Sequence, residues 1–196
     1  VPWQYLLTRG LVIFFLLNIY LFLEEGSSFY KNYLKVGTSG LIGGIGLGTA
    51  MITFIWSITN TTAAVTLLCL AAMPFITALL GFLFLKENIS LTVWISIIVA
   101  AFGIIIMASD NTGQNSLPGL IFGLISALGF SIFSVSLRWR KETPKFTTVA
   151  IAGFFCFLFS VVMISSSGAN FLSTGKNEAL FATHGTLVCL GLILYS

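Results

Sequence analysis

The chain has 196 residues, of which 57% are hydrophobic and only 8% are charged, and its mean hydropathy is +1.04. A water-soluble domain of this length cannot bury so much apolar surface in one core, so the composition excludes a soluble fold and indicates a membrane protein. The formal net charge is only +3, which gives no basis for nucleic-acid binding.

Six apolar segments follow one another along the chain, and hardly a charge interrupts any of them. An α-helix rises about 1.5 Å per residue, so about 20 residues cross a hydrocarbon layer that is roughly 30 Å thick. A seventh apolar run, at residues 185–196, is too short to cross, and we expect only part of a helix there. We therefore predict an all-α polytopic membrane protein, a bundle with six complete transmembrane helices and a partial seventh. The six predicted spans are residues 5–23, 38–58, 61–85, 91–108, 120–137 and 146–165.

Neither end of the sequence has the features of a natural terminus. The chain begins with Val1 instead of Met, a few residues before one apolar segment, and it stops inside another. A half-helix in lipid would leave backbone groups without hydrogen-bond partners. We therefore expect an interior piece of a longer protein, and a natural terminus with a short re-entrant segment is the alternative. The first segment lacks a basic leader and a cleavage site, so it is not a signal peptide.

Basic residues concentrate in alternate loops between the predicted spans. The first, third and fifth loops carry seven of the nine Lys and Arg residues, and the second and fourth loops carry none. Under the positive-inside rule the basic loops are cytoplasmic, and the segments at Asn60, Asp110 and Lys176 are external. The sequence thus predicts a multi-pass protein of the plasma or inner membrane. The cytoplasmic basic residues are Lys31, Lys35, Lys86, Arg138, Arg140, Lys141 and Lys145.

The sequence contains no motif for catalysis or metal binding. Cys69, Cys156 and Cys189 lie inside apolar segments without a C-x-x-C or Cys/His pattern, so we expect neither disulfides nor a metal site. The predicted spans hold no Asp or Glu, and there is no G-x-S-x-G, H-E-x-x-H or phosphate-binding glycine loop. We therefore expect no catalytic residues, no cofactor and no enzymatic activity.

The second and third predicted spans each separate a polar helix face from a packing face. Residues three or four apart share a face, and a stripe of glycines lets another helix approach closely. A short turn joins these two spans, so we expect their polar stripes to line a common substrate cavity. The packing residues are Gly37, Gly40, Gly44 and Gly48, with Gly119 and Gly123 in the fifth span. The cavity candidates are Thr49, Thr53, Trp56, Asn60, Thr62, Thr66, Cys69 and Thr77.

Ordinary helix packing is the alternative explanation of these polar stripes. Thr and Ser hydroxyls can bond to the backbone of their own helix, and Trp56 beside Asn60 can serve as an interfacial anchor. Pro74 interrupts the third span near mid-membrane, and we expect a kink there because proline removes one backbone hydrogen bond.

Three further polar residues have a simpler expected role than substrate handling. We expect Arg9, just inside the first span, to extend to the outer surface rather than to bind substrate. We expect Asn18 to hydrogen-bond to another helix rather than to line a cavity. His184 is expected to be solvated at the outer interface rather than to carry protons.

A set of residues in the third and fourth spans forms a longer pattern. It comprises Asn60-Thr61-Thr62-Ala63-Ala64-Val65, the run from Met73-Pro74-Phe75 to Leu85-Lys86-Glu87, Trp94 and Ala101-Phe102-Gly103-Ile104-Ile105. This pattern resembles an EamA domain of the drug/metabolite transporter superfamily, with its mid-span Pro, a small-residue run ending in Leu-x-Glu and a Gly late in the next helix. Arg9 matches the Arg that commonly opens the second helix of such domains, whereas Lys86 stands where the family often has Gly.

The resemblance implies about ten helices in two five-helix repeats of opposite orientation, the inverted-repeat design of secondary transporters. On that template, residues 1–109 form the first repeat without its first helix. Residues 110–117 form an external linker, and residues 118–196 begin a second repeat that is truncated in its third helix. An internal echo agrees, because Pro2…Gly10…Phe14-Phe15 is followed later by Pro144…Gly153-Phe154-Phe155.

The resemblance also implies a secondary transporter that moves small organic metabolites or drugs by alternating access, with export as the expected direction. The expected partners are the lipid bilayer and a small-molecule substrate, with no nucleic acid, and a homodimer is left open. A membrane-embedded enzyme or a sensor, with active residues outside this sequence, is the alternative function.

Overall fold

A computed structural model of the chain describes residues 2–109, 116–171 and 175–194. These residues form helices and no strand, and six helical segments among them are long and apolar enough to cross a membrane. The prediction of an all-α polytopic membrane protein is therefore confirmed. The helices are α1 (Pro2–Glu25), α2 (Tyr30–Lys35), α3 (Gly37–Asn60), α4 (Ala63–Ala71), α5 (Met73–Leu85), α6 (Leu91–Ser109), α7 (Leu117–Trp139), α8 (Lys145–Ser167) and α9 (Gly175–Leu194).

Most predicted spans correspond to helices of the structure. The third predicted span is divided between α4 and α5, which together form one membrane segment, Ala63–Leu85. The fourth corresponds to α6, whose described apolar stretch Leu91–Gly103 is shorter than the six segments counted as full spans. The predicted linker at 110–117, with Asp110, lies outside the described residues apart from Ser116 and Leu117.

The expectation of only a partial seventh helix is wrong. Helix α9 begins at Gly175 rather than at residue 185, and 18 of its residues form a candidate span. Polar residues early in α9 lower its mean hydropathy and hid it from the sequence pattern. Two of them contact α1: Glu178 accepts a hydrogen bond from Thr8 Oγ1 at 2.7 Å, and His184 Nδ1 lies 2.9 Å from the Tyr5 hydroxyl.

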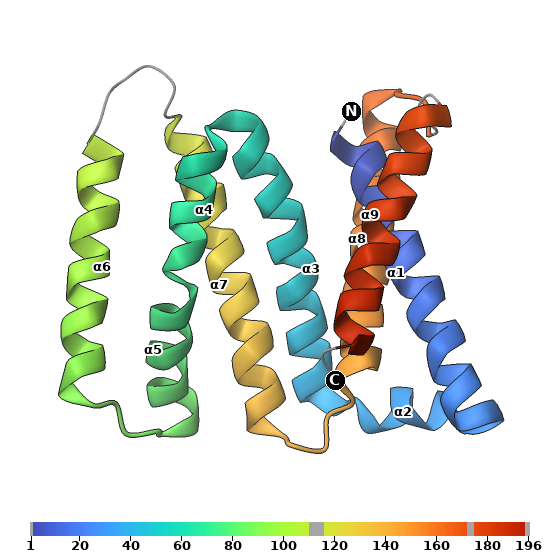
Figure 1. The fold of residues 1–196 in the computed structure, drawn as a ribbon, viewed down its shortest axis with the longest axis horizontal. Helices are drawn as coiled ribbons and strands as arrows, with labels where there is room; N and C mark the ends of the chain where they lie inside the picture. The colour runs from blue at the N-terminus through green and yellow to red at the C-terminus, as the bar shows by residue number, and fades with distance from the viewer. Residues whose placement is uncertain (1, 110–115, 172–174, 195–196) are drawn as a thin grey trace.

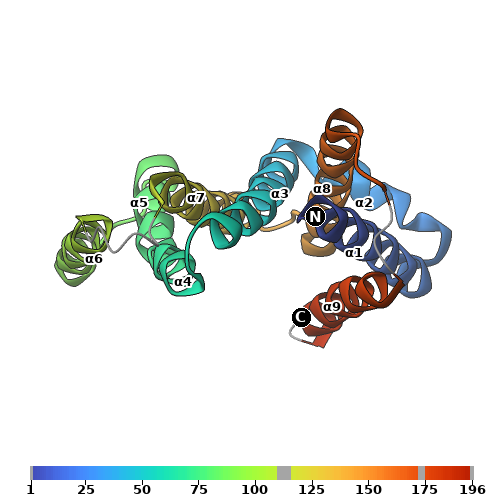
Figure 2. The same cartoon turned by 90° about the horizontal axis from the view of Figure 1, so that it is seen from above.

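The spans run alternately up and down and stand in a row (Figure 1). Seen from above, the row passes from α6 through α5, α4 and α7 to α3, and then to α8, α1 and α9 (Figure 2). Helix α2, the turn between α5 and α6, and the loop between α7 and α8 lie together at one end (Figure 1). These three segments are the basic loops of the sequence, so the loop cations gather where the helices end on one side of the bundle, which we call the basic end.

The third predicted span breaks at Ala72, between α4 and α5. Pro74 lies in the first turn of α5, where its missing N–H removes no bond within that helix. Ser131 of α7 donates a hydrogen bond to the Met73 carbonyl oxygen at 3.0 Å. This contact holds the start of α5 against α7.

Helix α3 packs against α7 on one side and α8 on the other, and glycines form both contacts. A Cβ atom on Gly46 would lie 3.1 Å from the Gly129 carbonyl oxygen, and one on Gly129 would lie 2.5 Å from that of Gly46. Toward α8, a Cβ on Gly44 or Gly48 would lie 3.1 or 3.2 Å from a backbone carbonyl oxygen. The three helices approach to backbone contact because these side chains are absent.

Helices α1 and α8 cross where Gly10 meets Gly153. A Cβ on Gly10 would lie 2.7 Å from the Gly153 carbonyl oxygen, and a Cβ on Gly153 would lie 2.9 Å from that of Gly10. The same Cβ on Gly10 would lie 3.0 Å from the backbone nitrogen of Phe157, four residues after Gly153. The Cβ on Gly153 would lie 3.2 Å from the backbone nitrogen of Phe14, four residues after Gly10. The contact is therefore reciprocal about a local two-fold axis.

The contacts beside this crossing follow the same relation. A Cβ on Gly48 of α3 would lie 2.6 Å from the side chain of Phe155, two residues after Gly153. A Cβ on Gly185 of α9 would lie 2.9 Å from the side chain of Val12, two residues after Gly10. The α3–α8 contact and the α9–α1 contact are thus local counterparts of each other.

We predict that Gly129→Leu in the complete protein lowers the free energy of unfolding by about 1–3 kcal/mol, because the new side chain forces α7 away from α3. Gly103→Leu on α6 is the matched control, since no described atom lies within 4 Å of a Cβ at Gly103. Thermal unfolding in detergent would measure both. Equal unfolding midpoints for the two variants would contradict the backbone contact.

Candidate functional site

Two of the predicted cavity residues on α3, Thr53 and Asn60, direct their polar groups to their own helix. Thr53 is buried, and its hydroxyl donates to the Thr49 carbonyl oxygen at 2.8 Å. The Asn60 side-chain amide donates to the Trp56 carbonyl oxygen at 2.8 Å. These groups are therefore satisfied without a ligand or a neighbouring helix.

The predicted cavity residues on α4 lie against α7. Thr66 and Cys69 are both 0% exposed. The Thr66 hydroxyl lies 2.9 Å from the Ser57 hydroxyl, and the Ser57 hydroxyl donates to the Gly119 carbonyl oxygen at 2.7 Å. Cys69 Sγ lies 3.9 Å from the Leu120 carbonyl oxygen. The structure thus brings polar atoms of α3, α4 and α7 together in a packed contact, and a substrate-binding role for Thr66 and Cys69 stays a prediction.

The other two candidates on this side lie apart from that contact. Thr62 precedes α4 and caps it, because its hydroxyl accepts a hydrogen bond from the Val65 N–H at 3.3 Å. Thr77 lies in α5, beyond the break at Ala72, and is partly buried.

Trp56 is the aromatic centre of a contact between four helices. Its ring centroid lies 5.3 Å from that of Trp3 on α1 and 4.6 Å from that of Phe122 on α7. Trp3 in turn lies 5.8 Å from Phe159 on α8. Trp56 therefore links both halves of the row, which is a larger role than that of an isolated interfacial anchor.

The predicted packing glycines face three different neighbours. Gly40, Gly44 and Gly48 face α8 and the residues just before it, whereas Gly119 and Gly123 face the end of α3 and Cys69 of α4. Gly37 has φ +58° and contacts the Arg140 guanidinium group. This left-handed conformation explains why glycine occupies the first position of α3.

Several buried serines were not predicted, and Gly10 and Gly153 were identified only as part of the internal echo, not as a helix contact. Ser126 donates to the Ala50 carbonyl oxygen at 2.9 Å, and the Ser39 and Thr143 hydroxyls lie 2.6 Å apart. Single serines in apolar segments give little signal by themselves. Ser126 does lie three residues after Gly123, so its place on a small-residue face was visible in the sequence.

A second polar cluster joins the N-terminal halves of α1 and α9. The Arg9 guanidinium carbon lies 5.8 Å from the Tyr5 ring centroid, and the Tyr5 hydroxyl lies 2.9 Å from His184 Nδ1. Arg9 Nε is buried without a hydrogen-bond partner, and no ion pair joins Arg9 to another described residue. Thr8 and Glu178 complete the cluster through their 2.7 Å hydrogen bond. An ionisable side chain within a membrane-spanning helix is energetically costly, and such side chains usually mark functional sites.

The structure modifies the expectations for Arg9 and His184. The Arg9 side chain extends toward Tyr5, one turn closer to the start of α1, which is the expected direction, yet its Nε does not reach solvent. His184 is exposed but lies beside the Tyr5 hydroxyl, so it is more than a solvated interfacial side chain.

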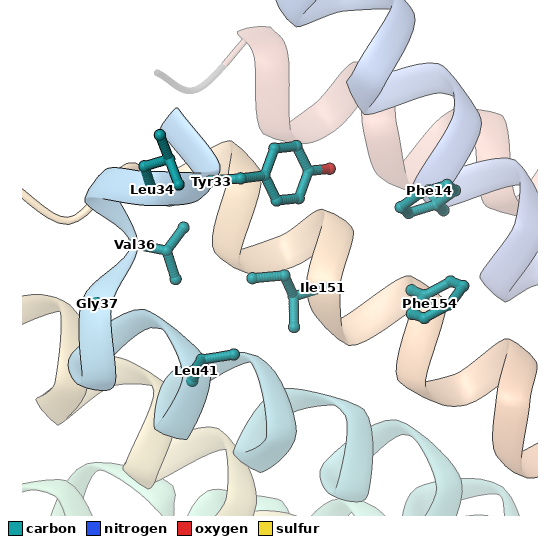
Figure 3. Close-up of a pocket in the computed structure, with 8 residues that line it drawn as sticks. All are labelled: Phe14, Tyr33, Leu34, Val36, Gly37, Leu41, Ile151 and Phe154. Atoms are coloured by element: carbon teal, nitrogen blue, oxygen red, sulfur yellow. The ribbon is translucent and has the colours of Figure 1, made fainter. Parts of the chain in front are cut away.

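A cavity of about 570 Å³ lies at the opposite end, between α1, α2, α3 and α8 (Figure 3). Tyr33 of α2 borders it and donates a hydrogen bond to Asn18 Oδ1 of α1 at 2.7 Å, so Asn18 makes the expected bond to another helix. Burial raises the pKa of the Tyr33 phenol, and the bond to Asn18 partly opposes this shift. The apolar lining residues are Phe14, Leu34, Val36, Leu41, Ile151 and Phe154.

A second cavity, of about 470 Å³, lies between α3, α5 and α7. Its lining includes Ile42, Phe84 and Trp139. The Arg138–Glu87 ion pair, 3.2 Å long, joins the ends of α7 and α5 at this level. Of the residues predicted for the site, Gly37 borders the first of these two cavities and none borders the second.

The six apolar helical segments define a multi-pass membrane protein, and the comparisons with known proteins add its family. Residues 2–109 match the model of the EamA-like transporter family, and the chain belongs to this family. It is 26% identical over 166 residues to an "Uncharacterized transporter" of Helicobacter pylori (strain J99 / ATCC 700824). This match covers 82% of the chain and 53% of that protein, so the chain spans about half the length of its relative. No solved structure matches the chain.

We predict that Ser57→Ala and Thr66→Val each reduce stability by about 0.5–1.5 kcal/mol, because each removes a buried hydrogen bond between α3 and α4. The double variant should cost less than the sum of the two, since both hydroxyls belong to one network. Thr59→Val is the control, because its exposed hydroxyl bonds only to α3 itself. Additive losses in thermal unfolding of the complete protein would contradict the network.

Proposed function

We propose that this chain is part of a secondary carrier that exports small organic metabolites or drugs by alternating access. Membership of the EamA-like transporter family supports transport in general. The observation that carries the proposal further is the reciprocal contact of Gly10 and Gly153. Two units related by an axis in the membrane plane can exchange an outward-open and an inward-open arrangement around one site.

The proposed division of the chain follows from this relation. Residues 1–109 belong to one repeat and residues 118–196 to the second, and the crossing of α1 with α8 joins them. The basic end of the row is proposed to be cytoplasmic in a plasma or inner membrane. Labelling of a cysteine at Lys141 by an impermeant maleimide outside intact cells would contradict this orientation.

Two polar regions are proposed to meet the substrate. The first comprises Arg9, Tyr5 and His184, where a cation at membrane depth is available to a polar or anionic group. The second is the threonine stripe of α3 and α4. This stripe is closed here because Thr66 and Cys69 pack against α7. Its role therefore requires α4 to separate from α7 during transport.

We predict that cells expressing the complete gene release at least one small organic compound faster than cells without it. Mass spectrometry of the medium and the cell extract would measure this release. Arg9→Gln should lower the release at equal protein level, because it removes the cation inside the membrane.

Lys141→Gln is the control, since it removes one positive charge at the basic end of the helices, and it should leave release unchanged. Equal metabolite profiles with and without the wild-type gene would contradict the carrier. Equal release by wild type and Arg9→Gln would contradict the role of Arg9.

A further inference from the structure

The larger cavity lies at the basic end of the row, next to α2 (Figure 3). Its lining comes from α1, α3 and α8 and from α2 and the residue after it, and Tyr33 supplies the one polar side chain. That phenol is already engaged by Asn18. The cavity can therefore accommodate an apolar group, but it provides few hydrogen-bond partners for a polar one.

The edge of this cavity carries positive charge. Lys31 and Lys35 are exposed on α2, and the Arg140 guanidinium group contacts Gly37, which lines the cavity. Acidic residues are present at the same end, at Glu24, Glu25 and Glu142. Glu25 is occupied, because its carboxylate accepts a hydrogen bond from the Asn32 side chain at 2.7 Å.

The position of α2 fixes the depth of these charges. Helix α2 lies across the ends of the spans rather than parallel to them (Figure 1). Its lysines are therefore at the level where lipid headgroups lie, and the cavity extends from there into the hydrocarbon region. Basic pockets between membrane helices at the cytoplasmic side are places where anionic lipid headgroups bind.

We propose that an anionic phospholipid occupies this cavity. One acyl chain lies against Phe14, Ile151 and Phe154, and the phosphate is held by Lys31, Lys35 and Arg140. The apolar lining explains why an acyl chain binds, and the three cations explain a preference for negatively charged headgroups. The proposal depends on the membrane fold and does not depend on the substrate or direction of transport.

The test uses the complete carrier, purified and stripped of lipid, and native mass spectrometry with phosphatidylglycerol or phosphatidylcholine of identical acyl chains. Wild type should bind phosphatidylglycerol at least about tenfold more tightly. Replacing Lys31, Lys35 and Arg140 together by Gln should remove this preference. Replacing Lys141 and Lys145 by Gln at the same end should leave it unchanged.

Two adjacent residues provide a matched pair for the apolar part. Leu41 and Ile42 are 50% and 48% exposed, but Leu41 lines this cavity and Ile42 lines the other one. Leu41→Trp should block lipid retention, and Ile42→Trp should not. Thermal unfolding of both variants would verify that they are folded.

Equal affinity of wild type for the two lipids would overturn the proposal. So would equal lipid retention by folded Leu41→Trp and Ile42→Trp, because the lipid would then bind elsewhere. Retention of neither lipid by the complete carrier would also overturn the proposal.

Discussion

Close contact between helix backbones is the constraint on which this structure depends. Lipid tails are as apolar as the side chains that face them, so burial of apolar surface does not drive helices together within a membrane. Association relies on dispersion contacts and hydrogen bonds, and both need short distances. The glycine pairs Gly46–Gly129 and Gly10–Gly153 provide them. Because α3 and α7 lie so close, Ser126 can donate to a backbone carbonyl of its neighbour.

The basic end of the helices and the opposite end differ, although the helix crossings are reciprocal. Five residues before Gly10 stands Tyr5, which contacts His184 on α9. The counterparts in the other half are Thr148, five residues before Gly153, and Leu47 on α3, which cannot form such a pair. One end thus has a polar cluster around a partly buried cation, and the other has an apolar cavity with a basic edge. In a carrier, such asymmetry gives the outward and inward arrangements different energies and different ligands.

The fold class followed from the sequence because lipid-spanning helices must be long and apolar, and the break in the third span followed from Pro74. Helix α9 did not, because its polar residues pair with α1 and a hydropathy window registers only their polarity. For the site, spacing alone identified the faces of Thr66 and Cys69. It did not reveal that α7 covers them, since that depends on a contact between residues about 50 positions apart. Ser57 and Arg9 show the same limit, because their surroundings come from distant segments.

The central claim is that two inverted units move against each other around the α1–α8 crossing. Double electron–electron resonance on the complete carrier tests it with two spin-label pairs. Each pair joins one repeat to the other: Leu23 and Trp139 report the basic end, and Ile58 and Leu180 report the opposite end, and all four side chains are exposed. Addition of the exported compound should lengthen one distance and shorten the other, because alternating access closes one end as it opens the other. Distances that stay unchanged, or that change in the same direction at both ends, would contradict the account.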